Sequence, residues 1–319
     1  MARARLIPAL LQALLAPLGR HARWALPLGV FTGIVFPQLA SLARPLLEAA
    51  VIGTFTAALL RLDWGALARV VRAPGPGLWL VSWLLVGSPL VVWALAAAGG
   101  LDEGLGRALV LQAAAPPIGS AAVFAMIVGL AGALSVFGTV VATLALPVTL
   151  TALLALLLPG SGLQVDLGAF FLRASAFVAA PFVIAWAARR ALGVSRLARN
   201  DELLAGLNVV LLVVFAIAVM DGVTARFLRD PGLIAQLLLF ACVAAVVLHL
   251  AGYALLRARG VDAGYEAALI FGNRNMGLML AITAGTAGEV FSLYVGIAQI
   301  PMYFAPLVVT PILRRARRR

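Results

Sequence analysis

The sequence is poor in charged residues and contains no lysine. Only 11% of its 319 residues are charged, whereas an ordinary soluble domain carries roughly 25%. Hydrophobic residues make up 64% of the chain, and the mean hydropathy is +1.08. This composition excludes a typical soluble domain and predicts an all-α, polytopic membrane protein.

Cysteine and histidine are also scarce, which limits the chemistry that the chain can perform. The single cysteine, Cys242, excludes an intrachain disulfide and a metal site built from cysteines. The sequence contains neither a His-Glu-x-x-His nor a Gly-x-Ser-x-Gly motif, and no cluster of Asp or His residues. We therefore expect no enzymatic activity and no cofactor, and a membrane enzyme is only a minor alternative.

The net charge is +12, and all 24 basic residues are arginines. A soluble protein with this charge would be a candidate for nucleic-acid binding, but no basic stretch here is interleaved with aromatic residues. The arginines instead lie between apolar runs, where they set the orientation of membrane helices. We expect the lipid bilayer as a partner, no nucleic acid and no obligatory protein partner.

Apolar runs predict ten membrane helices, because one crossing needs about 20 mainly apolar residues. The predicted spans are 25–43, 45–60, 76–97, 103–130, 133–158, 166–188, 203–222, 232–256, 263–287 and 290–313. A basic interfacial segment, 1–24, precedes them, and it has no small-residue cleavage site of a signal peptide. A basic tail, 314–319, follows them and is expected to contact anionic headgroups.

Arginine is concentrated in alternate loops between these spans. The loops on the poorer side hold only Arg44, Arg107, Arg226 and Arg229. Since basic loops favour the cytoplasmic side, both termini are predicted to be cytoplasmic, in the inner (plasma) membrane of a bacterium.

Ten spans divide into two halves of five, 25–158 and 159–313. An odd number of spans in each half inverts the second relative to the first, which is the architecture of many secondary transporters. In such folds, helices interrupted at corresponding positions mark the binding site. The fourth span contains Pro116 and Pro117, and the ninth contains a polar cluster between Gly272 and Gly277.

Both interruptions predict a polar site. Pro116 and Pro117 remove two backbone donors, which frees carbonyls and leaves N–H groups unpaired from about Gly119 onward. An N-terminus of this kind attracts anions. The alternative for the proline pair is a static kink.

The ninth span carries the sharper signal, since Arg274 lies between Asn273 and Asn275 in an apolar run. A charge near the bilayer centre costs at least about 2.5–3.5 kcal/mol, so it usually faces a partner, a cavity or a pathway. We expect a broken helix lining a wet cavity. The alternative is a packed helix in which Arg274 pairs with a carboxylate such as Glu266 or Asp221.

These residues resemble the bile acid:sodium symporter family. The resemblance implies ten helices in two inverted repeats, with broken helices four and nine crossing at the binding site, and substrates that are bile acids and other carboxylates. Asn275 matches a family asparagine that contacts substrate. The segments that carry the resemblance are Pro89 with Trp93, Ala115–Val123, Ala133–Val136 with Thr139, Thr143 and Pro147, and Gly272–Leu278.

The sequence departs from the family at the positions that bind sodium. Ser135 and Thr139 match residual sodium-site positions, but Ile270 stands where the family has a glutamate. Four further family ligands are replaced here, a pair by Ala121-Ala122 and the other two by Arg274 and Leu84. We therefore expect that neither sodium site is intact, that sodium occupancy at Ser135 and Thr139 is doubtful, and that Arg274 supplies a fixed charge instead.

The sequence thus predicts a secondary transporter for a small organic anion, working by alternating access and without sodium coupling. One alternative is a sodium-coupled symporter whose ion sites are rebuilt from other oxygens. A second is a channel or membrane sensor on the same fold that does not transport. The expected substrate-binding residues are Pro116, Pro117, Gly119, Ser120, Asn273, Arg274 and Asn275.

Overall fold

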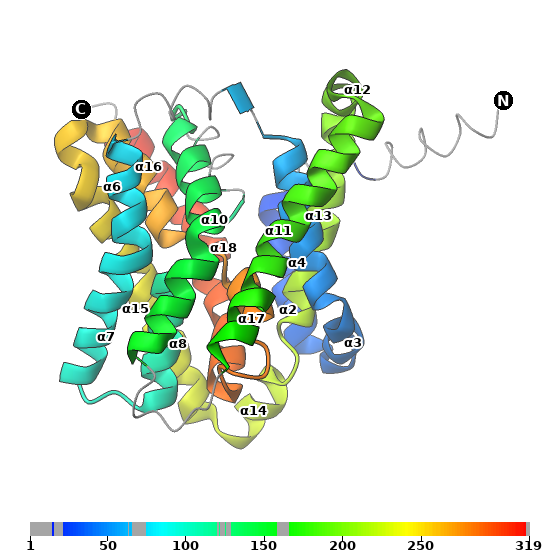
Figure 1. Cartoon of the computed structure of the whole chain (residues 1–319). Coiled ribbons are helices and arrows are strands. Elements are labelled where there is room, and N and C mark those ends of the chain that lie inside the picture. The colour runs from blue at the N-terminus through cyan, green and yellow to red at the C-terminus, as the bar shows by residue number, and fades with distance from the viewer. Residues whose placement is uncertain are drawn as a thin grey trace. The chain divides into compact units, whose positions relative to one another are not determined.

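The computed structural model describes residues 15, 22–62, 64–65, 75–119, 121, 125, 129–157 and 166–316, and every regular element in this part is a helix (Figure 1). The predicted all-α class is confirmed for these residues. Most of the predicted segment 1–24, together with Ser120, Ala122 and residues 317–319, lies outside the described residues.

Six helical stretches among the described residues are long and apolar enough to cross a membrane. They are Pro37–Leu60, Gly77–Ala98, Ala133–Leu157, Leu167–Leu192, Asp201–Arg229 and Pro231–Arg259. These stretches fit a protein that crosses a membrane several times, whereas the count of ten and the inverted repeats stay predictions.

The first predicted span, 25–43, differs from the observed helices. Helix α2 (Ala22–Val35) ends before Phe36, and α3 (Pro37–Ala43) begins with a proline at its first position. A proline there cannot donate to the preceding turn, and it pushes the residue before it out of helical geometry. The predicted span 25–43 contains no break at this proline.

The chain forms two compact units, one from residues 1–62 and 180–229 and the other from residues 63–179 and 230–319. Each unit takes a part from both of the predicted halves, 25–158 and 159–313, so neither unit corresponds to one half. Helix α11 (Leu167–Leu192) contributes its first part to the second unit and its remainder to the first.

The first unit is built around α13 (Asp201–Ala218), which packs against α2, α3 and α4 (Leu47–Leu60). Close approach is needed at Gly33, where an added Cβ would lie 2.8 Å from the Ile217 carbonyl oxygen. Its other described elements are η1 (Arg44–Leu46), α12 (Val194–Arg199) and α14 (Val223–Arg229).

The second unit contains both interrupted helices. Helix α10 packs on α6, η2 and α16, while α15 packs along α16 and α18. The elements of this unit are α6 (Gly75–Ser82), the π-helical turn η2 (Trp83–Gly87), α7 (Ser88–Ala98), α8 (Glu103–Ala114), α10 (Ala133–Leu157), α15 (Pro231–Leu256), η3 (Arg257–Arg259), α16 (Val261–Gly272), α17 (Met276–Ile282) and α18 (Glu289–Ala316).

Helices α15 and α16 meet at Gly252. A Cβ at this glycine would lie 2.5 Å from the Ala267 carbonyl oxygen and 2.8 Å from the Phe271 Cβ. Because the first of these atoms belongs to the backbone, no side-chain rotation could relieve the contact. Small residues at helix crossings allow this close packing in membrane proteins.

We expect the substitution Gly252→Ala to destabilise the protein by about 1–3 kcal/mol, because overpacking forces the two helices apart. Gly232→Ala in the same helix is the matched control, since its Cβ would only meet the Asp230 carboxylate at 3.6 Å. Replacing a helical glycine there should stabilise by roughly 0.5–1 kcal/mol. Thermal unfolding of both variants in detergent tests the packing, and equal melting temperatures would contradict it.

Candidate functional site

The two interrupted helices cross as short extended segments. Helix α8 ends at Ala114, and α16 ends at Gly272 before α17 begins at Met276. Pro117 and Arg274 form an antiparallel bridge between the segments. The Ile118 N–H donates to the Asn273 carbonyl oxygen (2.9 Å), and the Asn275 N–H donates to the Pro116 carbonyl oxygen (2.7 Å). The proline pair therefore ends the helix, and a static kink does not describe it.

Arg274 lies inside this crossing with 1% of its surface exposed. Its Nε donates to the Phe271 carbonyl oxygen (2.7 Å). Its Nη1 donates to the carbonyl oxygens of Ala115 (2.8 Å) and Leu84 (3.4 Å). Its Nη2 donates to the Ser88 hydroxyl (3.2 Å). The side chain therefore joins α16, the end of α8 and the π-helical turn η2.

Two of these carbonyls lose their helical partners at the helix interruptions. The Ala115 carbonyl lies where α8 has ended and the backbone has become extended. The Phe271 carbonyl would pair with the N–H of Asn275 in a continuous helix, but that N–H bonds to Pro116 instead. A buried carbonyl without a donor costs about 1–3 kcal/mol, so the guanidinium offsets the cost of both interruptions.

The Leu84 carbonyl is freed by a different cause. In the π-helical turn the Ser88 N–H bonds to the Trp83 carbonyl oxygen. The next donor in this register would come from Pro89, which has no N–H. The Ser88 hydroxyl lies 2.9 Å from the Leu84 carbonyl oxygen, and Arg274 provides a second donor. Single π-turns of this kind often occur at functional sites.

No carboxylate pairs with Arg274 among the described residues. Its hydrogen bonds all go to neutral acceptors, and its guanidinium carbon lies 5.0 Å from the Phe271 ring centroid. Glu266 accepts instead from the Ser135 N–H at the start of α10 (2.8 Å). The alternative in which Arg274 pairs with Glu266 is therefore wrong.

The two asparagines beside Arg274 have different environments. Asn273 is 1% exposed, and its Nδ2 donates to the Leu269 carbonyl oxygen. Asn275 is half-buried, and its Oδ1 accepts from the Leu278 N–H (3.0 Å), which caps α17. This cap uses the amide oxygen and fixes the orientation of the amide. The Asn275 NH₂ group has no acceptor among the described residues.

The other predicted substrate residues lie on both sides of the crossing. Pro116 and Pro117 are buried, whereas Ile118 and Gly119 are half-buried. Ser120 lies outside the described residues. The described polar or backbone groups that lie near the surface of the crossing are therefore those of Ile118, Gly119 and Asn275.

The predicted residual sodium ligands are buried on α10. The hydroxyls of Ser135 and Thr139 have no hydrogen-bond partner among the described residues, and neither has the Asn273 Oδ1. Ile270 and Leu84, at two positions where the resemblance implies sodium ligands, are both 0% exposed and belong to one hydrophobic cluster. This cluster provides hydrocarbon where a cation would need oxygen.

Sequence reasoning missed three participants: Ser88, the Leu84 carbonyl and the contact of Glu266 with Ser135. The Gly-Ser-Pro sequence at residues 87–89, within an apolar run, was a usable signal for the first two. A proline has no N–H, so it leaves a carbonyl of the preceding turn without a donor. A serine directly before the proline places its hydroxyl close to that carbonyl.

No family model matches the chain, and a search of the curated proteins finds no matching relative. The resemblance to the bile acid:sodium symporter family stays a prediction. The geometry of the crossing therefore carries the functional argument.

We expect Arg274→Lys to lower the free energy of unfolding by about 2–4 kcal/mol. An ammonium has its three donors on one atom and cannot reach the acceptors that the guanidinium fork reaches, so at least one or two carbonyls lose their donor. The matched control is Arg173→Lys, because the hydrogen bonds of Arg173 to described residues both go to a single carbonyl, that of Ala281. Denaturation in detergent measures both, and a loss no greater than the control's would refute the role of Arg274.

Proposed function

We propose that this protein is a secondary transporter of a small organic anion, bound at the crossing of the interrupted helices. The observation that carries the proposal is a buried guanidinium that has no carboxylate partner among the described residues, next to a half-buried asparagine whose amide donors bond to none of them. Interrupted helices near the bilayer midplane are where many secondary transporters bind substrate. The likeness of these segments to the bile acid:sodium symporter family also favours a carboxylate.

The charge of Arg274 makes the crossing attractive to an anion. Carbonyl dipoles stabilise the guanidinium but leave its unit charge in place. Charges separated by several ångströms interact more strongly in a poorly hydrated site than in bulk water. In this proposal Arg274 acts through its field, because its burial and its bonds to protein oxygens keep it from touching substrate.

Direct contact is assigned to Asn275. Its carbonyl oxygen is committed to the Leu278 N–H, so the group that it offers to a ligand is an NH₂ donor. Donors recognise the oxygens of a carboxylate, and they leave a cation without a ligand. The backbone of Gly119, half-buried on the other segment, supplies the remaining contacts.

The proposed mechanism needs no sodium ion. Freed backbone carbonyls at broken helices can coordinate sodium in transporters, but here three such carbonyls bond to Arg274. A fixed charge supplies no driving energy, so the transport would be facilitated diffusion, exchange or proton-coupled. We propose the inner membrane of a bacterium as its location, with both termini cytoplasmic.

We expect one or more small organic anions to raise the melting temperature of the purified protein equally in sodium and in choline buffer. A ligand at 100 times its dissociation constant stabilises by about 2.7 kcal/mol, which a thermal-shift screen detects. Asn275→Asp should abolish the shift, because it replaces the NH₂ donors by a negative charge. Since Asp also caps helices well and its negative charge would lie in the field of Arg274, the melting temperature of this variant without ligand should not fall.

The matched control for this variant is Asn200→Asp, which makes the same change at the N-cap of α13. It should keep the full anion shift. Saturable uptake into proteoliposomes then separates a carrier from a channel or a sensor. If Asn275→Asp kept the shift, the contact assigned to Asn275 would be refuted.

A sodium-coupled symporter is the second candidate, because the hydroxyls of Ser135 and Thr139 are buried without hydrogen-bond partners among the described residues, and the Ser135 N–H donates to the Glu266 carboxylate. A small hard cation takes oxygen ligands of these kinds, whereas the cluster around Ile270 offers only hydrocarbon. For this candidate, sodium alone should raise the melting temperature, and Ser135→Ala with Thr139→Val should remove the effect. Equal stability of the unsubstituted protein in sodium and choline would reject it.

A further inference from the structure

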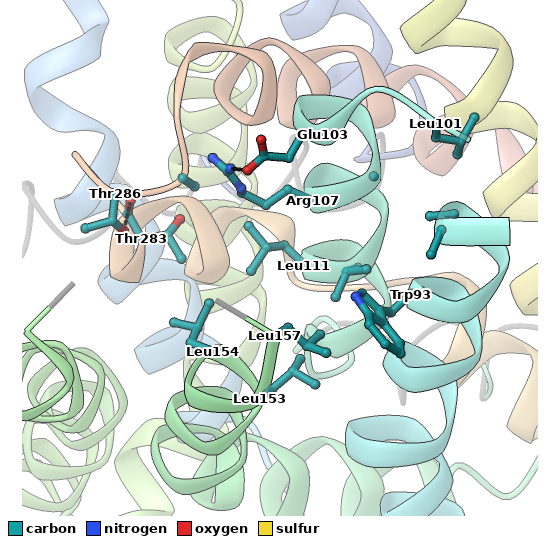
Figure 2. Close-up of a pocket in the computed structure, with 15 residues that line it drawn as sticks. Trp93, Leu101, Glu103, Arg107, Leu111, Leu153, Leu154, Leu157, Thr283 and Thr286 are labelled. Atoms are coloured by element: carbon teal, nitrogen blue, oxygen red, sulfur yellow. Dashed lines mark hydrogen bonds and ion pairs between the residues drawn. The ribbon is translucent and has the colours of Figure 1, made fainter. Parts of the chain in front are cut away.

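The unit that contains the crossing also encloses a separate pocket of about 240 Å³. It lies between α7, α8, the end of α10 and the segment after α17, and it shares no residue with the crossing (Figure 2). The residues that give it its apolar character include Trp93, Val110, Leu111, Leu153, Leu154 and Leu157. Nothing in the proposed transport function uses this pocket.

The threonine hydroxyls that line the pocket are already bonded to the protein. Thr283 donates to the Met279 carbonyl oxygen (2.7 Å), and Thr286 donates to that of Thr283 (2.9 Å). A polar group placed among such walls would lose its hydrogen bonds to water without replacement. The part of a ligand that enters this pocket is therefore hydrocarbon.

One end of the pocket is charged. Glu103 and Arg107 form an ion pair one turn apart on α8, and Figure 2 shows them above Leu111, with Leu153 and Leu157 at the other end. Their side chains are 63% and 23% exposed, so both remain accessible. Glu103 and Arg107 come soon after the apolar stretch Gly77–Ala98, which is long enough to cross a membrane. Because the end of such a stretch reaches the membrane surface, the ion pair would lie at the depth of the lipid headgroups.

We propose that this pocket binds one acyl chain of a zwitterionic phospholipid, with the phosphate on Arg107 and the ammonium on Glu103. The ion pair is neutral as a whole and presents both signs side by side, which complements a headgroup with both signs. The volume lies below the roughly 300–1,000 Å³ of pockets for drug-sized ligands. It therefore suits a segment of one acyl chain, and the rest of the lipid would lie outside the pocket.

Gly106 provides the variant that fills the pocket. It lines the pocket, and a Cβ there would meet only the Ala96 Cβ, at an ordinary 3.6 Å. Gly106→Leu therefore adds a side chain within the cavity without a backbone clash. The matched control is Ala94→Leu, which adds bulk at an exposed residue of α7 that does not line the pocket.

Native mass spectrometry measures the lipid after purification in equal amounts of phosphatidylethanolamine and phosphatidylglycerol. The unsubstituted protein and Ala94→Leu should each retain one phosphatidylethanolamine, and Gly106→Leu should retain at least tenfold less. Glu103→Gln, which leaves Arg107 without its counter-charge, should reverse the preference toward phosphatidylglycerol. This variant keeps Asp102 as the cap of α8, so its fold should be unchanged.

Three results would overturn the proposal. Equal retention by Gly106→Leu and Ala94→Leu would mean that the lipid is not in the pocket. A preference of the unsubstituted protein for phosphatidylglycerol, or no retained lipid, would reject the assigned headgroup contacts. If Gly106→Leu failed to fold, the lipid preference of Glu103→Gln would decide alone.

Discussion

The crossing depends on the hydrogen bonds of one buried guanidinium. Two helices that stop in apolar surroundings leave carbonyls without donors, and neither lipid nor water can replace those donors. Arg274 donates to Phe271, Ala115 and Leu84 from one planar group, which no other side chain could do with the same geometry. The extended segments can then lie side by side, joined by the hydrogen bonds from Ile118 to Asn273 and from Asn275 to Pro116.

Arg274 and the adjacent Asn275 have different roles in the crossing. The guanidinium holds the segments together and supplies a positive field, while the half-exposed Asn275 is the residue that a ligand can reach. The hydrogen bond from the Leu278 N–H to the Asn275 side chain serves both structure and binding. It caps α17, and it fixes the direction in which the Asn275 NH₂ group points. Residues next to each other in the sequence thus differ in role because the backbone between them is extended and presents them to opposite sides.

The sequence predicted the interruptions well because their causes are local. Pro116, Pro117 and the glycines around Arg274 break helices whatever surrounds them. The partners of Arg274 could not be predicted, since Leu84 and Ala115 lie more than a hundred residues away and contribute backbone atoms that any residue type has. The partner of Glu266 could not be predicted for a related reason. Opposite charges suggest an ion pair with Arg274, but a backbone N–H at the start of a helix, here that of Ser135, also binds a carboxylate.

The positive charge of Arg274 is covalently attached, and this limits the ion gradients to which the proposed transport could be coupled. A ligand shifts a conformational equilibrium only through a difference in its affinity for the two states. A dissociable cation at the crossing would give such a difference and would link its own gradient to that of the substrate. The guanidinium never leaves, so in the proposed transport cycle its charge is present in every state and links no ion gradient to the substrate. Coupling in the proposed transport would therefore have to come from a group that does exchange its charge, and among the described residues the buried Glu266 carboxylate can bind and release a proton.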